Sequence, residues 1–379
     1  MAGELMTGAS DSLRATLLTP PGRGAVAVVT LAGTGAAAIV AKHFCATNGH
    51  VPTFPLQRIR FGRWRAGSAA FSESPNNELG EELVVCRRGD EQFEIHCHGG
   101  DAASAAILHG LERDGCMIVP WTEWIAADEA DPIAVEAQIA LAAARTTRIA
   151  AILLDQQAGA LRRAIDEASR LAEAGDRIAA LTIVDRLLAR AALGLRLTAP
   201  FRVVFCGRPN VGKSSLLNAA LGYRRAVVFD QPGTTRDVVT AATVVDGWPI
   251  ELSDTAGLRA SDDELETAGI AAARNRLTEA DLVVVVIDVT ATWTDDDAAI
   301  LAEHPEAIVV LNKSDATEVF DAARPAGLRT SAVTGLGIDE LLKTIVARSV
   351  PQPPSPGEAV LFTDRQVQQL REFRASLLA

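Results

Sequence analysis

The chain has 379 residues and a formal net charge of −12, and 48% of its residues are hydrophobic. This length predicts two or three domains that each bury a core, and the negative charge argues against a protein that coats nucleic acid nonspecifically. No apolar run is long enough to span a membrane, and the first residues lack the regions of a secretion signal. The five cysteines are too irregularly spaced for a disulfide framework, so we expect a cytoplasmic protein.

The first part of the chain, residues 1–122, has the pattern of a small α+β domain. A turn rich in proline and glycine at residues 19–24 leads into a β-type run at residues 25–29. Further strands are predicted at residues 61–64, 83–85 and 93–96, and helices from residue 36 onward and over residues 102–111.

Two histidines, His96 and His98, alternate along the last of these predicted strands, so both imidazoles would lie on one face. This spacing is compatible with a metal site. However, the sequence supplies no second pair at ligand spacing, because Cys86 and Cys116 are isolated. We therefore favour a structural role, in which the histidines anchor the turn at residues 99–100 to the helix after it.

A phosphate-binding pattern follows an Ala- and Leu-rich, helix-like region at about residues 132–197. Residues 207–215, Gly-Arg-Pro-Asn-Val-Gly-Lys-Ser-Ser, match G-x-x-x-x-G-K-[ST] between a strand-like run and a helix-like run. Backbone N–H groups of such a loop point at phosphate oxygens, Lys213 would reach the β- and γ-phosphates, and the Ser214 hydroxyl would ligate Mg²⁺. A chance glycine-rich turn is the alternative. The expected nucleotide contacts are Asn210, Val211, Gly212, Lys213, Ser214 and Ser215.

Three later stretches argue for a guanine nucleotide. Asp254 follows a strand-like run and places a carboxylate beside Mg²⁺, and Gly257 would lie near the γ-phosphate. Asp315, in Asn-Lys-Ser-Asp at residues 312–315, can accept two hydrogen bonds from guanine, whereas adenine would leave it unpaired. The order and spacing of these motifs resemble the P-loop GTPases. The expected base contacts are Asn312, Lys313, Asp315, Ser331 and Ala332.

Two N-terminal stretches, Thr-Pro-Pro-Gly-Arg-Gly-Ala at residues 19–25 and Glu-Ile-His-Cys-His-Gly-Gly at residues 94–100, look like signatures of the MnmE (TrmE) family of tRNA modification GTPases. The resemblance implies an α/β P-loop GTPase domain inserted in an α-helical domain and preceded by a small α+β domain. The implied parts are a folate-binding-like domain (1–122), a first helical part (123–198), the GTPase domain (199–350), and a linker with a second helical part (351–379). It also implies a homodimer that modifies tRNA wobble uridines with the flavoprotein MnmG.

The resemblance assigns roles to two further loops. Residues 233–237, Gly-Thr-Thr-Arg-Asp, resemble switch I, in which Gly233 and Thr234 would line the nucleotide and Thr235 would ligate Mg²⁺. Leu258 stands where many GTPases use glutamine to orient the attacking water. The family instead uses a glutamate further along switch II, and Glu266 occupies the matching position. The alternative is that Glu266 belongs to a solvated acidic face.

The family also uses a potassium ion in place of an arginine finger. Its positive charge would lie where negative charge develops between the β- and γ-phosphates. The resemblance places the ion against the P-loop asparagine and switch I, with the ligands Asn210, Phe229, Gln231 and Thr234.

The N-terminal domain departs from the family pattern. Glu94 matches the family's glutamate, but Thr30 stands in place of a folate-contacting arginine, and the family's Pro-Gly-Glu-Phe and Cys-x-Gly-Lys stretches have no counterpart. Each lost charged contact costs roughly 1–3 kcal/mol, which argues against binding of 5-formyltetrahydrofolate. Two alternatives to tRNA modification therefore stay open. One is a divergent GTPase switch without folate chemistry; the other is a ribosome-assembly GTPase of the Era or Der type, disfavoured because no Gly-x-x-Gly RNA-binding segment or second P-loop is present.

Overall fold

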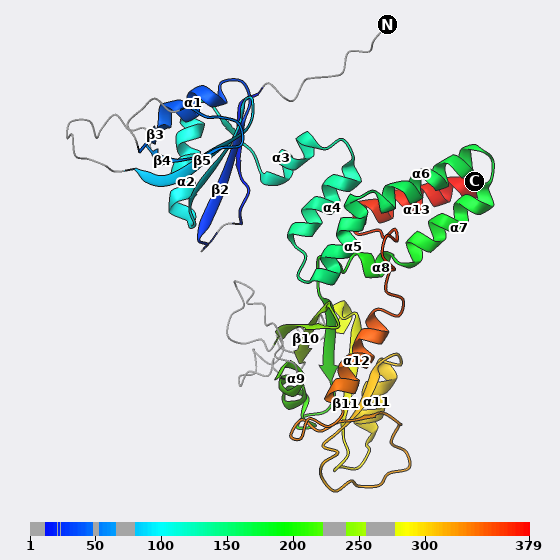
Figure 1. Ribbon diagram of the computed structural model, residues 1–379. Helices are drawn as coiled ribbons and strands as arrows, with labels where there is room; N and C mark the ends of the chain where they lie inside the picture. Colours follow the sequence, from blue (N-terminus) through cyan, green and yellow to red (C-terminus); the bar gives the residue numbers. More distant parts are fainter. Residues whose placement is uncertain are drawn as a thin grey trace, which may run out of the picture. The chain divides into compact units, whose positions relative to one another are not determined.

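The computed structural model describes residues 12–20, 22, 24–47, 53–65, 80–222, 240–254 and 277–379 (Figure 1). The chain divides into two compact units, Met1–Pro132 and Ile133–Ala379. The sequence placed the end of the first domain at residue 122, and the first unit extends ten residues further. Helix α3 (Trp121–Asp128) spans the predicted boundary. It packs within the first unit, because the Arg14 guanidinium lies 4.6 Å from the centre of the Trp124 ring.

The first unit contains a seven-stranded mixed sheet with the order β3-β4-β5-β6-β2-β1-β7. Helices α1 and α2 pack on this sheet, and α3 contacts β1 (Figure 1). The elements are β1 (Arg14–Leu17), β2 (Val26–Ala32), α1 (Ala36–His43), β3 (Phe44–Ala46), β4 (Ile59–Trp64), β5 (Glu81–Gly89), β6 (Gln92–His98), α2 (Asp101–Arg113), β7 (Met117–Ile118) and α3 (Trp121–Asp128).

The predicted role of the two histidines on β6 is wrong. Alternate residues of this strand, among them Ile95, point into the core, which leaves the histidines on the other face. His96 Nε2 lies 3.1 Å from Glu94 Oε2, and His98 Nδ1 lies 2.6 Å from Glu81 Oε1. The histidines therefore bind glutamates of β6 and β5 instead of anchoring the following turn. Within the described ranges, no group of three or more histidine, cysteine, aspartate or glutamate side chains could hold a metal ion.

The second unit begins with helices that share one core with the last helix of the chain. Gln156, which is fully buried, joins the two segments: its Nε2 donates to the Glu358 carbonyl at 3.0 Å, and its Oε1 accepts from the Val360 N–H at 3.1 Å. The helices are α4 (Pro132–Ala142), α5 (Thr147–Gln157), α6 (Ala160–Glu173), α7 (Arg177–Ala189), α8 (Ala191–Gly194) and α13 (Asp364–Leu378).

Between these helical segments the chain forms a six-stranded sheet with the order β13-β12-β11-β8-β10-β9. Of the strands that the structure describes in this sheet, only β9 runs antiparallel to its neighbour, so β8, β10, β11 and β12 end at the same edge. Helices α9 and α12 cover one face and α11 covers the other. The elements are β8 (Phe201–Cys206), α9 (Lys213–Gly222), β9 (Thr240–Val245), β10 (Trp248–Asp254), β11 (Leu282–Asp288), α11 (Asp295–Glu303), β12 (Ile308–Asn312), β13 (Leu328–Arg329) and α12 (Ile338–Ser349).

Strand β10 runs from the helical core to the edge at which the parallel strands of the sheet end. At its start, Trp248 is 2% exposed, belongs to the helical core and packs edge-to-face against Phe201. The turn before it is fixed from α5, because the Thr146 hydroxyl donates to the Gly247 carbonyl at 2.7 Å. At its end lies Asp254. One strand therefore joins the helical core to a predicted magnesium ligand.

All five cysteines lie in described ranges and carry free thiols. Burial raises the pKa of the Cys206 thiol to about 12, so this thiol is protonated at neutral pH.

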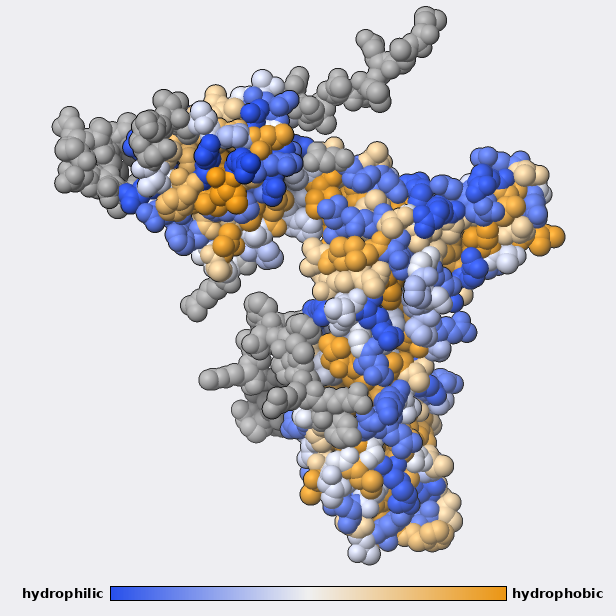
Figure 2. Space-filling view, in the orientation of Figure 1, coloured by the Kyte–Doolittle hydropathy of each residue, from blue (hydrophilic) through white to orange (hydrophobic). Residues whose placement is uncertain are grey.

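Of the helices that the structure describes, none is both long and apolar enough to cross a membrane. Figure 2 shows hydrophilic and hydrophobic residues interspersed over the helices of the second unit.

Candidate nucleotide-binding site

The P-loop adopts a backbone that glycine makes possible at two points. Gly207 has φ +143°, and a Cβ there would lie 2.4 Å from the Val286 carbonyl oxygen. Gly212 has φ +94°, and a Cβ there would lie 2.5 Å from Asn312 Nδ2. Both contacts are too close for any side chain, so glycine lets the loop approach β11 and β12 closely. The predicted strand–loop–helix arrangement is present, with β8 before the loop and α9 after it.

The Lys213 side chain folds back under the loop. It is 5% exposed, and its Nζ donates to the carbonyl oxygens of Gly207 at 2.9 Å and Arg208 at 2.8 Å. The ammonium group therefore lies inside the arch whose backbone N–H groups are expected to face phosphate. A cation in this position attracts an anion to the start of α9.

Two of the three predicted magnesium ligands, Ser214 and Asp254, lie in contact. The Ser214 hydroxyl, at the start of α9, donates a short hydrogen bond to Oδ2 of Asp254 at the end of β10. Asp254 is 1% exposed. A hydroxyl oxygen and a carboxylate oxygen side by side form the hard donor set that Mg²⁺ prefers, so these residues fit the ion.

Asn312 links the guanine motif to the P-loop. Its Nδ2 donates to the Val211 carbonyl at 2.9 Å, and its Oδ1 accepts from the Thr330 hydroxyl at 3.3 Å. Asn312 is 1% exposed and Thr330 is fully buried. Both ends of the Asn312 amide are thus used to hold neighbouring motifs, which identifies Asn312 as a residue that shapes the site.

Lys313 forms a second link. Its Nζ donates to the Asn210 carbonyl at 2.9 Å and to Asp288 Oδ2 at 2.6 Å. Burial tends to raise the pKa of Asp288, but its hydrogen bonds with Lys313 and Thr290 outweigh this effect, so the pKa falls below its usual value. Asp288 ends β11 and was not predicted from the sequence. The sequence did carry a signal for Asp288: it is an acidic residue at the end of a valine-rich strand, at the same sheet edge as the nucleotide motifs.

The remaining base-motif residues differ in their surroundings. Asp315 is exposed, as a carboxylate that receives a base must be. Ser331 is fully buried, and its backbone N–H donates to the Leu336 carbonyl at 2.9 Å, so this N–H is already used within the turn. Its hydroxyl oxygen accepts from the N–H groups of Val333 and Thr334. Ser331 therefore shapes the turn, and Ala332 follows it partly buried.

Several predicted site residues cannot be placed. The switch I and switch II residues Phe229, Gln231, Gly233, Thr234, Thr235, Gly257, Leu258 and Glu266 lie outside the described residues. Glu94 lies on β6 in the first unit, where it binds Arg88 and His96.

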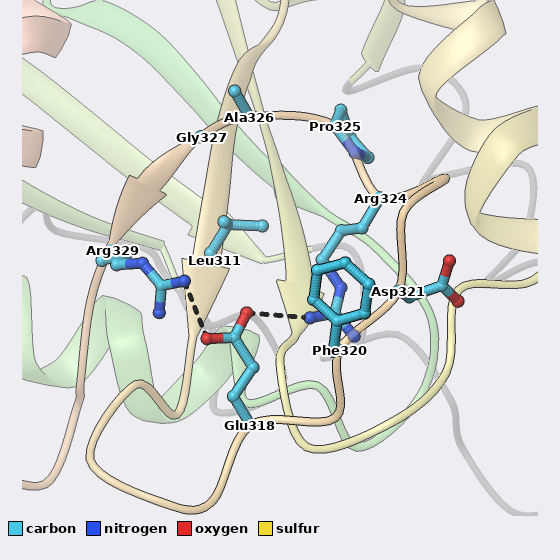
Figure 3. Close-up of a pocket in the computed structure, with 9 residues that line it drawn as sticks. All are labelled: Leu311, Glu318, Phe320, Asp321, Arg324, Pro325, Ala326, Gly327 and Arg329. Atoms are coloured by element: carbon cyan, nitrogen blue, oxygen red, sulfur yellow. Dashed lines mark hydrogen bonds and ion pairs between the residues drawn. The ribbon is translucent and has the colours of Figure 1, made fainter.

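A hollow of about 580 Å³ lies beside β12 and β13 (Figure 3). Glu318 accepts hydrogen bonds from Arg324 at 3.2 Å and Arg329 at 2.7 Å, and Asp321 adds a second carboxylate to the lining. The two positive and two negative side chains balance, so the hollow has no net attraction for phosphate. None of the predicted nucleotide ligands lines it. The lining residues are Leu311, Glu318, Phe320, Asp321, Arg324, Pro325, Ala326, Gly327 and Arg329.

A family model and solved structures are similar to part of the chain. The family model described as a 50S ribosome-binding GTPase matches residues 202–313. Among solved structures, the G domain of the T. maritima FeoB iron transporter aligns with 39% of this chain and 98% of its own, at 29% identity and a TM-score of 0.30.

Two relatives match far more of the chain. The tRNA modification GTPase MnmE of Moorella thermoacetica is 33% identical over 97% of this chain and 87% of its own length. The protein of the same name from Synechococcus sp. (strain JA-3-3Ab) is 33% identical over 94% of this chain and 85% of its own length. The chain belongs to the MnmE family of tRNA modification GTPases.

Proposed function

We propose that this chain binds GTP and hydrolyses it with the help of Mg²⁺ and K⁺, and that it acts in tRNA wobble-uridine modification. The observation that carries this proposal is the meeting of the phosphate, magnesium and base motifs at one sheet edge. Ser214 contacts Asp254, and Asn312 contacts the Val211 carbonyl. Lys313 contacts the carbonyl of Asn210, the residue before Val211. A single nucleotide placed there would touch all three motifs.

Each part of the nucleotide has a proposed partner. Backbone N–H groups from Val211 to Ser215 and the Lys213 ammonium would bind the phosphates. Ser214, Thr235 and Asp254 would hold Mg²⁺, which when bound supplies positive charge to the β- and γ-phosphate oxygens. Exposed Asp315 would accept the guanine N–H groups.

Hydrolysis needs a group that orients water and a cation that stabilises the transition state. We assign the first role to Glu266, because Leu258 cannot hydrogen-bond to water and a carboxylate can. Asn210, Phe229, Gln231 and Thr234 would hold K⁺. Two features of Asn210 support this assignment. The residue is exposed. Its backbone, at φ +63°, is held by the hydrogen bond that Lys313 donates to its carbonyl oxygen.

The names of the relatives support the proposed process. Their names give tRNA modification as their role, and matches over nearly the whole chain support this reading over a ribosome-assembly GTPase. We further propose a cytoplasmic homodimer that works with MnmG. Its GTPase domain, residues 199–350, is inserted between two helical parts, the second at 351–379, and follows a folate-binding-like domain that ends with the first compact unit.

A second candidate function, a GTPase switch without folate chemistry, is favoured by the surroundings of Glu94. A β-bulge between Arg87 and Gly89 places Arg88 Nη2 2.7 Å from Glu94 Oε2. Burial tends to raise the pKa of Glu94, but its bonds with Arg88 and His96 bring the pKa below the usual value. The carboxylate is thus ionised and already paired, so a ligand would have to compete with Arg88 for it.

Titration calorimetry with 5-formyltetrahydrofolate separates the two candidates. GTP affinity of the same preparation checks that the protein is folded, and co-purification with MnmG tests the partner. Folate binding that Arg88→Ala changes would place the ligand beside Glu94 and support tRNA modification. Normal GTP binding without folate or MnmG binding would favour the switch.

A further inference from the structure

The P-loop is tied to helix α11 by an ion pair. Arg208 Nε donates to Asp297 Oδ1 at 2.9 Å. The Asp297 side chain is 3% exposed, and that of Arg208 is 26% exposed. A carboxylate this deeply buried needs a charged or strongly hydrogen-bonding partner. Arg208 supplies that partner from the second position of the nucleotide-binding loop.

Asp297 is itself held in place. Its Oδ2 accepts from the Thr294 N–H at 3.1 Å and the Thr294 hydroxyl at 2.9 Å, and this hydroxyl also accepts from the Asp297 N–H at 3.4 Å. This reciprocal capping box fixes the first turn of α11. One carboxylate oxygen therefore caps the helix, while the other is directed at the P-loop.

We propose that Asp297 is a positioning residue that acts through Arg208 to hold the P-loop in its nucleotide-binding shape. The Arg208 carbonyl accepts from Lys213, and two residues later the Asn210 carbonyl accepts from Lys313. The loop is thus held on both sides of Pro209, by Asp297 on one side and by Lys313 on the other. A loop that is ordered before binding pays less conformational entropy when phosphate arrives.

This inference rests on the proposed binding of GTP at the same site, and it predicts how loss of the ion pair changes nucleotide affinity and turnover. The backbone N–H groups of a P-loop cradle the α- and β-phosphates, which GDP and GTP share, and they do so in both the ground state and the transition state. Loss of the ion pair should therefore weaken both nucleotides equally. KM should rise while kcat at saturating GTP stays unchanged, which is the signature of uniform binding.

The test measures GDP and GTP dissociation constants and steady-state hydrolysis for the full chain and its variants. Asp297→Asn removes the charge at constant shape, and Arg208→Ala removes the partner without touching α11. We expect each to raise both dissociation constants about tenfold, the double variant to add no more than a single one, and Arg208→Lys to recover part of the loss. Thr294→Val is the matched control, since it removes the cap hydroxyl but leaves the ion pair.

Three results would overturn the inference: single variants within twofold of the parent in affinity, additive losses in the double variant, or an equal loss in Thr294→Val, which would make Asp297 only a helix cap. Thermal unfolding of each variant shows whether a loss of affinity is due to misfolding. If Asp297→Asn is misfolded, the nucleotide affinity of Arg208→Ala decides whether the inference holds. A parent chain that binds neither GDP nor GTP would instead refute the proposed function.

Discussion

The Ser214 hydroxyl donates a hydrogen bond to the Asp254 carboxylate and so joins the first turn of α9 to the last residue of β10. The two residues are separated by 40 positions, and the parallel pairing of β10 with β8 brings them together. Asp254 lies opposite Phe205 in this pairing, one residue before β8 ends. The juxtaposition of these two proposed magnesium ligands is therefore a consequence of strand register.

We predict that Asp254→Asn weakens magnesium binding without unfolding the protein. The amide oxygen can still accept from Ser214, but the negative charge that attracts the ion is lost. The Mg²⁺ concentration for half-maximal GTP hydrolysis should rise about tenfold or more. Glu251→Gln, which removes a carboxylate from the middle of the same strand, is the control and should leave the magnesium dependence unchanged. An unaltered curve for Asp254→Asn would place the ion elsewhere.

A substitution at Asp315 should change the base that is bound. Asparagine presents an N–H donor where aspartate presents only acceptors, and xanthine carries a carbonyl where guanine carries an amine. Asp315→Asn should therefore lower GTP affinity about tenfold or more and improve binding of xanthosine triphosphate. Competition against a fluorescent nucleotide measures both values. Glu306→Gln is a control at another exposed carboxylate, and unchanged selectivity in Asp315→Asn would refute the guanine assignment.

The stability of the first unit should depend on pH through Asp114. The hydrogen bond from Lys42, at 2.5 Å, and that from His43, at 2.6 Å, lower the pKa of Asp114 below 3.8, against the opposing effect of burial. A lowered folded-state pKa contributes stability that is present above pH 3.8 and is lost as the pH falls through the folded value.

Asp114→Asn should therefore reduce the free energy of unfolding by about 1 kcal/mol at pH 7, and the difference from the parent should shrink below pH 3.8. Urea unfolding followed by tryptophan fluorescence measures it, because Trp64 stacks on His43 with ring centres 5.0 Å apart. Asp90→Asn alters a fully exposed carboxylate and should have no effect. A difference that stays constant from pH 7 to pH 3 would contradict this account.

Local patterns in the sequence were enough to place the strands and helices that carry the nucleotide motifs. The apolar runs before Gly207 and Asn312 are β8 and β12, and the run at residues 250–252 lies in β10. These elements are local, because the period of apolar residues decides whether a segment is a strand or a helix. The convergence of the motifs at one edge follows from parallel pairing, which the strand–loop–helix pattern already implies.

The contacts that are distant in sequence could not be predicted. Arg208 and Asp297 lie 89 residues apart, and nothing in either local segment indicates the other. His98 shows the same limit: alternation predicted its face correctly but could not reveal that Glu81 on the neighbouring strand is its partner. The domain boundary that the resemblance implied, after residue 122, falls inside helix α3, whereas the contact between Arg14 and Trp124 places the helix in the first unit.

Glu266 is the proposed water-orienting residue, and a substitution there should separate catalysis from binding. Glu266→Ala should abolish most of the GTP hydrolysis while the dissociation constant for GTP stays the same, because the carboxylate is expected to contact the attacking water and not the nucleotide. Single-turnover hydrolysis and nucleotide titration measure the two effects. Glu264→Ala is the matched control in the same acidic run, and an equal loss of rate there would support a solvated acidic face.

We propose that GTP hydrolysis by this chain is assisted by potassium. The most direct test is steady-state GTP hydrolysis by the full chain with saturating Mg²⁺, in KCl and in NaCl of the same ionic strength. We predict hydrolysis about tenfold faster in KCl, because K⁺ would supply the positive charge between the β- and γ-phosphates. Equal rates in the two salts would contradict the potassium assignment, and absence of hydrolysis in both would contradict the account as a whole.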